Sequence, residues 1–467
     1  MEKQTNLFNQ PKEKVLKEPK PKKEKKSKAS ERDPSITLNW QQEEALVKLK
    51  EFLKDESKLE FTLKGAGGTG KTFLIKELFK RKKPNANEWF VPYTVIGVCV
   101  THMARLNLMK SIPNTTTYAS AANLQMMFDP NGEVYFVEKY TNHDFSELKG
   151  FKYIVFDECS MVDDVMKKNV RKCCSIDAKI IWLGDDAQLP PINAKGEHDS
   201  PTFDIPDQYE LTIKMRQNNK DHIAILGDEI RSHIKGDWSI DFLNNLKQQW
   251  DPEKCKGYSI TTISNVIGSY VKNFQDGIDV RITSYRNKRI EQLNTMIRTF
   301  LWDDKSSEMY VPGEFIVMND QYSPNRDVLA YCGQTFRIQS LSIQMIEVVE
   351  CYMIVVPKWN RLPKSKETIT LLVPTHKGII HYKRELDLLK QQAITSRRWD
   401  SYQAFKTKFA NISYAYAMNN YKIQGSTITG CYVDLSDILA VKPISNKRKL
   451  QAFYVGCSRA THFLAIF

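Results

Sequence analysis

The pattern of apolar and polar positions predicts alternating strands and helices along most of the chain. Leu59, Phe61 and Leu63 alternate with more polar residues, as in a buried strand, and apolar side chains recur at helical spacing over Phe73–Phe79. Further strands are predicted where apolar residues run together, at Tyr93–Val100, Tyr153–Phe156, Ile180–Leu183, Val280–Tyr285 and Cys431–Leu435. Helical spacing also occurs at Ala45–Phe52, Ala104–Met109, His222–Ile234 and Leu293–Ile297. Strands that alternate with helices are typical of an α/β fold with parallel sheets.

Two stretches interrupt this alternation. Phe128–Phe136 combines turn residues with aromatic and β-branched neighbours, which predicts a β-hairpin inserted at residues 118–147. Runs such as Thr335–Ile338 and Tyr352–Val356 predict a small β-rich domain inserted at residues 311–410. This second insert ends in a mixture of basic and aromatic residues, Arg397–Phe409. We expect an amphipathic helix there, and a surface that stacks bases while holding phosphates is the alternative.

The stretch Gly65-Ala66-Gly67-Gly68-Thr69-Gly70-Lys71-Thr72 lies between a predicted strand and a predicted helix. In that context the pattern is typical of a phosphate-binding loop, because its glycines let several backbone N–H groups point at one oxyanion. We expect Lys71 to reach the β- and γ-phosphates of ATP and the Thr72 hydroxyl to ligate Mg²⁺. Upstream, Asn39 is expected to cap a helix, and the Gln42 amide is our candidate for recognising adenine.

Polar residues follow two other predicted strands at the same edge of the expected sheet. Asp157 and Glu158 come directly after Tyr153–Phe156, where Asp157 suits Mg²⁺ coordination and Glu158 suits polarisation of an attacking water. Gln188 lies in the turn after Ile180–Leu183 and could reach a γ-phosphate. Together with the glycine loop, these groups follow the order that a nucleotide-hydrolysing domain needs.

Further residues are candidates for contacts with nucleic acid or with the bound nucleotide. Thr101 and His102 follow a predicted strand and could contact a nucleic-acid backbone or begin the next helix. A second α/β unit begins near residue 208 and contains no second phosphate loop. If it faces the first unit, Arg216 and Arg459 are candidate arginine fingers for the same nucleotide.

Composition and charge restrict the possible functions. The chain has 467 residues, of which 41% are hydrophobic and 26% charged, with no apolar run long enough to span a bilayer. Nine cysteines without a C-x-x-C pair indicate free thiols in a reducing compartment, and no signal peptide is recognisable, so we expect a cytoplasmic protein. The first 33 residues hold eleven Lys/Arg and six Asp/Glu, which leaves +8 of the +13 net charge to the rest. We expect residues 1–35 to be a disordered basic tail that adds affinity for nucleic acid, is merely solvated, or acts as a nuclear-import signal.

The order of the motifs resembles that of superfamily 1 helicases. The ordered set is Gln42, Gly65–Thr72, Thr101–Ala104, Asp157-Glu158, Gly184–Pro191, Arg216, Lys422–Ser426 and Tyr454–Ala460. Within that superfamily the chain is most similar to the Dda-type helicases of bacteriophages, which belong to the branch that translocates 5′ to 3′. The resemblance implies two RecA-like domains, named 1A (36–117 and 148–207) and 2A (208–310 and 411–467). It also implies a strand-separating pin, 1B (118–147), and a barrel-like insert, 2B (311–410).

The resemblance also implies roles for individual residues. It gives ATPase roles to Lys71, Thr72, Asp157, Glu158, Gln188, Arg216 and Arg459, places Gly425 at the nucleotide, and makes Phe136 a wedge in the pin. Contacts to a DNA strand are implied for Thr101, His102, Asn287, Lys422 and Ser426. Family members often have Thr-x-His-Lys where this chain has Asn419-Asn420-Tyr421-Lys422, so Tyr421 could stack on a base instead.

The function that follows is ATP-dependent 5′→3′ translocation on single-stranded DNA with duplex unwinding, in DNA replication, repair or recombination. The expected partners are single-stranded and fork DNA, with replication or single-strand-binding proteins as further candidates, and the expected state is a monomer in the host cytoplasm if a phage encodes it. The residues leave two alternative functions open. One is a nucleotide-gated factor that loads or remodels nucleoprotein without processive unwinding, and the other is an RNA helicase.

Overall fold

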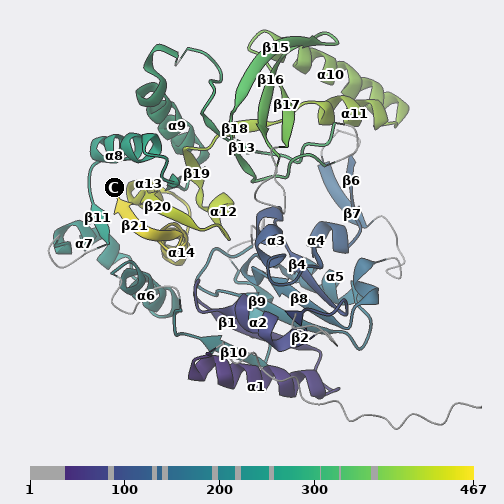
Figure 1. Ribbon diagram of the computed structural model, residues 1–467, viewed down its shortest axis with the longest axis vertical. Coiled ribbons are helices and arrows are strands. Elements are labelled where there is room, and N and C mark those ends of the chain that lie inside the picture. The colour runs from purple at the N-terminus through teal and green to yellow at the C-terminus, as the bar shows by residue number, and fades with distance from the viewer. Residues whose placement is uncertain are drawn as a thin grey trace, which may run out of the picture. The chain divides into compact units, whose positions relative to one another are not determined.

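The computed structural model describes most of the chain after the basic tail (Figure 1). The described residues are 37–82, 89–128, 134–138, 146–191, 198–215, 222–251, 257–305, 307–324, 328–358 and 367–467. Residues from Leu38 to Phe467 form one compact unit. The predictions for the tail, for Arg216 and for the turn at residues 129–133 lie outside the described residues.

A six-stranded sheet is built around the glycine-loop strand. Its order is β10 (Gln208–Leu211), β1 (Glu60–Gly65), β9 (Lys179–Gly184), β8 (Tyr153–Asp157), β4 (Val95–Cys99) and β5 (Thr115–Thr117), and every pair is parallel. Strands β4 and β9 are buried at every position, which is why both read as continuous apolar runs. We expected domain 2A to begin at residue 208, but β10 pairs with β1 in this sheet. That boundary was placed one strand too early.

Helices surround the first sheet. They are α1 (Trp40–Lys54), α2 (Lys71–Phe79), α3 (His102–Leu108), α4 (Tyr118–Ala121) and α5 (Asp164–Cys173). The predicted cap of α1 is confirmed, since Asn39 Oδ1 accepts a hydrogen bond from Gln42 N at 2.9 Å and the helix buries Ala45 and Leu49. Short elements complete this part: β2 (Arg81–Lys82), β3 (Trp89–Phe90), η2 (Glu147–Gly150), η3 (Cys159–Met161) and η4 (Pro201–Asp204).

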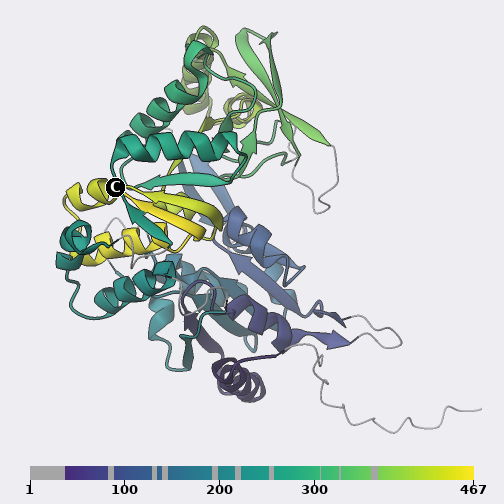
Figure 2. The same cartoon turned by 60° about the vertical axis from the view of Figure 1, so that its left-hand side comes forward.

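A second sheet has five strands, again all parallel. Its order is β11 (Tyr258–Ile260), β21 (Ala460–Ile466), β20 (Ile428–Val433), β12 (Val280–Ser284) and β19 (Ala417–Asn419). Its helices are α6 (His222–Lys235), α7 (Asp241–Gln249), α8 (Ile263–Gln275), α9 (Asn287–Trp302) with η5 (Asp303–Lys305), α12 (Asn420–Ile423), α13 (Leu435–Ala440) and α14 (Asn446–Cys457). Figure 2 shows helices on both sides of this sheet. The predicted α/β class, with two RecA-like parallel sheets, is therefore confirmed.

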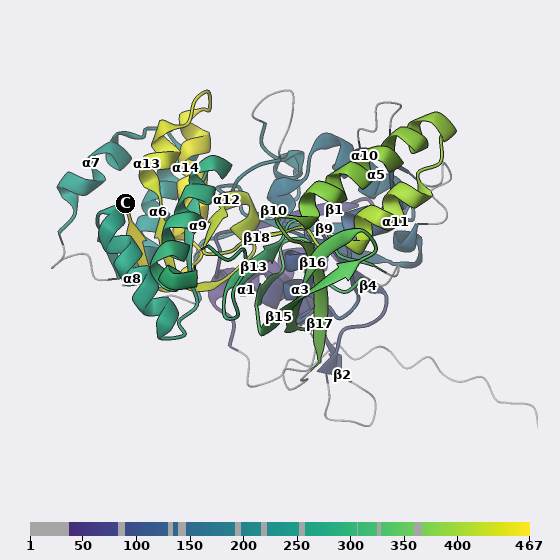
Figure 3. The same ribbon diagram turned by 90° about the horizontal axis from the view of Figure 1, so that it is seen from above.

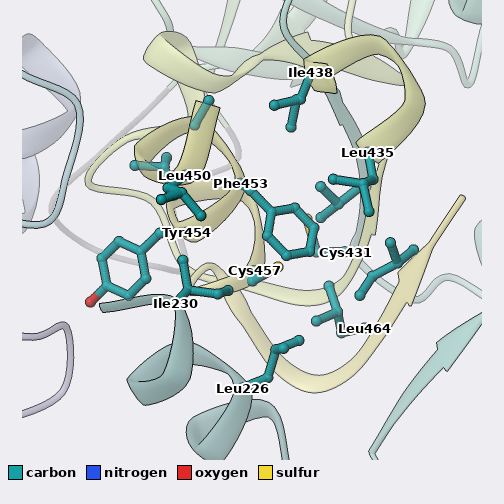
Figure 4. Close-up of a cluster of buried hydrophobic side chains, with 14 of the residues drawn as sticks. Leu226, Ile230, Cys431, Leu435, Ile438, Leu450, Phe453, Tyr454, Cys457 and Leu464 are labelled. Carbon is teal, nitrogen blue, oxygen red and sulfur yellow. The ribbon is translucent and has the colours of Figure 1, made fainter. Parts of the chain in front are cut away.

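Side chains of α6 and α14 form one core with strands β20 and β21. Figure 4 shows this cluster, in which Leu226 and Ile230 of α6 meet Phe453 and Cys457 of α14. Helices α8 and α9 build a separate core with β12 and β20. Because parallel strands bury both faces, each side of the sheet needs its own helical cover.

The first predicted insert is an antiparallel hairpin. Strands β6 (Leu124–Phe128) and β7 (Val134–Glu138) pair with Met126 opposite Phe136. The hairpin follows β5 and α4, which join the first sheet and its core rather than the hairpin. The strands therefore occupy only the middle of the expected range 118–147.

The second insert contains two small antiparallel sheets. One has the order β14 (Thr335–Arg337), β13 (Phe315–Met318) and β18 (Ile412–Tyr414), and the other β15 (Ser340–Ile346), β16 (Val349–Pro357) and β17 (Thr368–Pro374). Since β18 pairs with β13, the insert extends beyond the boundary that we expected at residue 410.

Two helices of this insert, α10 (Gly378–Ser396) and α11 (Asp400–Lys408), lie side by side in Figures 1 and 3. Helix α11 buries Tyr402 and Phe405, so the predicted amphipathic helix is confirmed and these rings face the core. In the part of the chain that the structure describes, no helix is long and apolar enough to cross a membrane.

Candidate active site

The glycine loop after β1 folds around the amino group of Lys71. Lys71 Nζ donates hydrogen bonds to the carbonyl oxygens of Gly65 at 2.6 Å and Ala66 at 3.2 Å, and Thr69 Oγ1 donates to Ala66 O at 2.9 Å. Gly70 has a φ of +89° directly before α2 begins at Lys71, so the loop turns sharply into a helix N-terminus. Backbone N–H groups, a helix dipole and one ammonium group meet here, which fits a phosphate.

Gln42 holds the loop from outside. Its Nε2 donates to Thr69 O at 3.1 Å and its Oε1 accepts from Asn39 N at 3.2 Å, so both ends of the amide bind the protein itself. The left-handed φ of Gly70 favours glycine, and a Cβ atom there would also lie 2.6 Å from Gln42 Nε2. The structure thus shows Gln42 positioning the loop, while the recognition of adenine stays a prediction.

Two carboxylates end β8 beside the loop. Asp157 Oδ1 accepts a hydrogen bond from Glu158 N at 2.9 Å, and Glu158 has a left-handed φ of +55°. Burial raises the pKa of Asp157 despite the opposing charge of Lys71. Burial and the Asp157 charge raise the pKa of Glu158 to about 7, opposed by Arg459 and Lys71. A carboxyl with a pKa near neutrality suits general base chemistry.

Gln188 is presented by the turn after β9. The turn closes with Gln188 N donating to Asp185 O at 3.1 Å, and the Gln188 side chain is buried. Its Oε1 accepts a hydrogen bond from Gln424 Nε2 at 3.0 Å. Gln424 follows α12 and belongs to the second sheet's part of the chain, so this amide pair links the two sheets. Our sequence analysis did not single out Gln424.

Arg459 lies across a cavity from the glycine loop. The cavity has a volume of about 110 Å³, and its lining includes Gly67 and Gly68 on one side and Ser426, Ser458 and Arg459 on the other. An atom at the Cβ position of Gly67 would lie 4.0 Å from Arg459 Nη2. Arg459 therefore faces the glycine loop across this cavity. Ser426 also lies here, and Arg459 Nη1 donates to its carbonyl at 3.4 Å.

Gly425 brings the second sheet close to the carboxylates. Its φ is +77°, and a Cβ atom there would lie 3.4 Å from Glu158 Oε1. Lys214 lines the cavity between the glycine loop and Arg459, and no pattern in the sequence singled it out. Its Nζ donates to Ala224 O at 2.8 Å and pairs with Asp228 at 2.7 Å.

The candidate DNA contacts of the first sheet lie at the start of α3. Thr101 caps this helix, its hydroxyl accepting from Ala104 N at 3.2 Å. The His102 ring stacks on Tyr331 of the second insert with centroids 4.2 Å apart. Burial and the Arg105 charge lower the pKa of His102 to about 4, so the ring is neutral at pH 7. Its Nδ1 is buried without a hydrogen-bond partner among the described residues.

Of the remaining candidates, Asn287 lies beside the helix that carries Tyr421 and Lys422, since its Oδ1 accepts a hydrogen bond at 3.5 Å from Asn419, the cap of α12. Asn287 is exposed at the start of α9, and Lys422 is exposed with its Nζ donating to Asn319 Oδ1 at 2.9 Å. Tyr421 is half-buried and packs near Tyr285, with ring centroids 6.4 Å apart. Phe136 lies in β7, and its side chain is not among those that the structure describes.

This geometry defines a phosphate-loop nucleotide site closed by an arginine from a second parallel sheet. Residues 37–245 match the family model described as an AAA domain. The loop, the helix N-terminus and the Asp157 carboxylate fit a nucleotide phosphate with its magnesium ion.

Two curated relatives match the chain more widely. An uncharacterized protein of Acanthamoeba polyphaga mimivirus is 24% identical, with 91% of this chain and 99% of that protein covered. The ATP-dependent DNA helicase dda of Enterobacteria phage T4 is 25% identical, with 61% of this chain and 63% of that helicase covered. The match thus spans less than two thirds of the phage helicase. The match to the phage T4 helicase confirms the predicted resemblance to Dda-type helicases.

Solved structures of similar fold include the Pif1 helicase from Bacteroides in complex with ADP-AlF3 and single-stranded DNA. It is 15% identical, covers 91% of each chain and gives a TM-score of 0.47. The Pif1 helicase from Candida albicans is 13% identical, covers 92% of this chain and 94% of its own, and gives a TM-score of 0.48.

Proposed function

We propose that this protein is an ATP-dependent DNA helicase that moves 5′→3′ along single-stranded DNA and separates duplex. The observation that carries the proposal is the cavity where the Lys71 loop and Arg459 face each other, with Glu158 beside them. The similarity to the phage T4 helicase supports DNA as the substrate.

Lys71 and the loop N–H groups would hold the β- and γ-phosphates of ATP, and Thr72 and Asp157 would hold Mg²⁺. Hydrolysis of the bound triphosphate would supply the free energy for movement. Glu158 would accept a proton from the attacking water, because its raised pKa lets it bind a proton near pH 7. Gln188 would orient that water, and Arg459, joined by Arg216, would stabilise the charge that develops on the phosphate.

The two sheets would grip the DNA in turn. Domain 1A, carrying the glycine loop, would contact the strand through Thr101 and His102, and domain 2A through Asn287, Tyr421 and Lys422. We expected Ser426 to contact DNA. Because it lines the cavity and its carbonyl oxygen accepts a hydrogen bond from Arg459, Ser426 would instead hold Arg459 in place. Closure around the nucleotide and reopening after hydrolysis would shift one domain along the strand. The hairpin β6–β7 would be the pin, with Phe136 as its wedge, and the second insert would brace it.

The test is an unwinding assay on matched duplexes with a 5′ or a 3′ single-stranded tail, made of DNA or of RNA. We expect ATP-dependent separation of the 5′-tailed DNA duplex and none of the 3′-tailed one, because the motor would run from its loading tail toward the junction. The control is the same assay with ADP.

Other outcomes identify the alternatives. ATP hydrolysis stimulated by DNA without strand separation on any tail would contradict helicase activity and favour a remodelling factor. Preference for the tailed RNA duplex would make the protein an RNA helicase, and separation from a 3′ tail would reverse the proposed polarity.

A further inference from the structure

A buried charged network joins the turn that presents Gln188 to helices of the second sheet. At its centre is Asp185, which has no exposed surface. Arg231 of α6 donates to Asp185 Oδ1 and Tyr454 of α14 donates to Oδ2 at 2.7 Å. Ala187 N also donates to Oδ1, at 3.1 Å. Asp185, Ala187 and Tyr454 lie within stretches of the motif series and Arg231 lies outside it, and the sequence analysis gave none of the four a role.

The network is anchored to the first sheet on its other side. Arg231 Nη2 donates to Asp186 Oδ1 at 3.1 Å and to Glu210 Oε1 of β10 at 2.9 Å. Lys235 pairs with the same two carboxylates, at 3.2 and 2.5 Å. Arg231 thus ties the end of β9 and the edge strand β10 to α6.

A buried carboxylate needs such partners. Burial favours its neutral form, but the charges of Arg231 and Lys71 hold the pKa of Asp185 below its ordinary value. An uncompensated charge at this place would be strongly unfavourable, so the three donors fix where the turn can lie.

The network is connected at both ends to residues of the candidate active site, Gln188 and Arg459. Asp185 closes the turn that presents Gln188, its carbonyl accepting from Gln188 N at 3.1 Å. Tyr454 lies in the last turn of α14, where its carbonyl accepts from Ser458 N at 2.9 Å, and Arg459 follows. In Figure 4 the Tyr454 ring lies at the edge of the apolar cluster, with its hydroxyl oxygen directed away from Phe453.

We propose that Arg231 and Tyr454 are positioning residues, which act through Asp185 to hold Gln188 in register with Arg459. This inference rests on the proposed ATPase. In this arrangement Gln188 and Arg459 form a single rigid pair, so both side chains reach the charge that develops on the phosphate together. A small displacement of either group would then lower the rate of hydrolysis more than the affinity for ATP.

The test is Tyr454→Phe, which removes only the hydroxyl and keeps the Arg231 charge on Asp185. The matched control is Tyr432→Phe. Tyr432 is also buried, and its hydroxyl bonds Ser269 and Asn273, each at 2.8 Å, on the α8 side of the second sheet. Both variants should lose similar thermal stability. Only Tyr454→Phe should lower the DNA-stimulated kcat, by about tenfold to a hundredfold, with little change in the KM for ATP.

A double-mutant cycle with Gln188→Ala separates positioning from general damage. If Tyr454 acts through the turn that presents Gln188, Tyr454→Phe should lower kcat by a much smaller factor in the Gln188→Ala variant than in the wild type. Unchanged kcat in Tyr454→Phe, or equal losses in both backgrounds, would overturn the inference while the wild type still hydrolyses ATP. A wild type that hydrolyses no ATP would overturn the proposed function, and this inference with it.

Discussion

Replacing Lys71 by alanine should abolish measurable ATP turnover, a loss of at least about a hundredfold, because it removes the ammonium group that lies inside the glycine loop, bonded to the carbonyl oxygens of Gly65 and Ala66. Binding of single-stranded DNA should remain close to that of the wild type, since the DNA candidates Thr101 and Lys422 lie outside the loop. The measurements are steady-state ATPase activity and fluorescence anisotropy with a labelled oligonucleotide.

The control for that variant is Lys76→Ala, which removes the same charge from the same helix, α2, beyond the glycine loop. It should leave turnover near the wild-type value. ATP turnover retained in Lys71→Ala would refute the assignment of the phosphate loop, and loss of both activities would indicate misfolding.

Glu158→Gln should give the second largest effect, a fall of about 10²- to 10⁴-fold in turnover with nucleotide binding retained. The amide keeps the shape of the side chain but cannot accept the proton. In the wild type, the carboxyl with a pKa of about 7 is protonated and inactive as a base at lower pH. The kcat/KM for ATP, which reports the free enzyme, should therefore rise as the pH increases through about 7 and level off above it.

Exposed Glu147 provides the matched control, because Glu147→Gln changes the same charge away from the loop. Its turnover and pH profile should follow the wild type. A flat profile between about pH 6 and about pH 8, or full activity in Glu158→Gln, would remove Glu158 from the role of base.

The sequence predicted the parts of the site that local patterns encode. The glycine loop before α2 and the carboxylates that end β8 are contiguous stretches whose spacing reflects their chemistry. The helix cap at Asn39 was predicted in the same way, whereas the capping-box contact of Gln42 was found only in the structure.

Contacts between distant segments carried no such signal. Asp185, Arg231 and Tyr454 meet only after both sheets have formed, and although Asp185 and Tyr454 lie in stretches of the motif series, no local pattern pairs them. The same reason explains the boundary errors at β10 and β18. Both strands lie where the pattern of apolar and polar residues changes, which is where we placed the boundaries. The sheet that each strand joins depends on its pairing partner far away in the chain, β1 for β10 and β13 for β18.

The central claim is that ATP hydrolysis at the cavity between the glycine loop and Arg459 drives movement along a single strand. Its most direct test is ATP-dependent displacement of streptavidin from oligonucleotides biotinylated at one end. The account predicts rapid release from the 3′ end, slow release from the 5′ end, and none from either end with Lys71→Ala. Hydrolysis of ATP by the wild type without faster release from either end would contradict it.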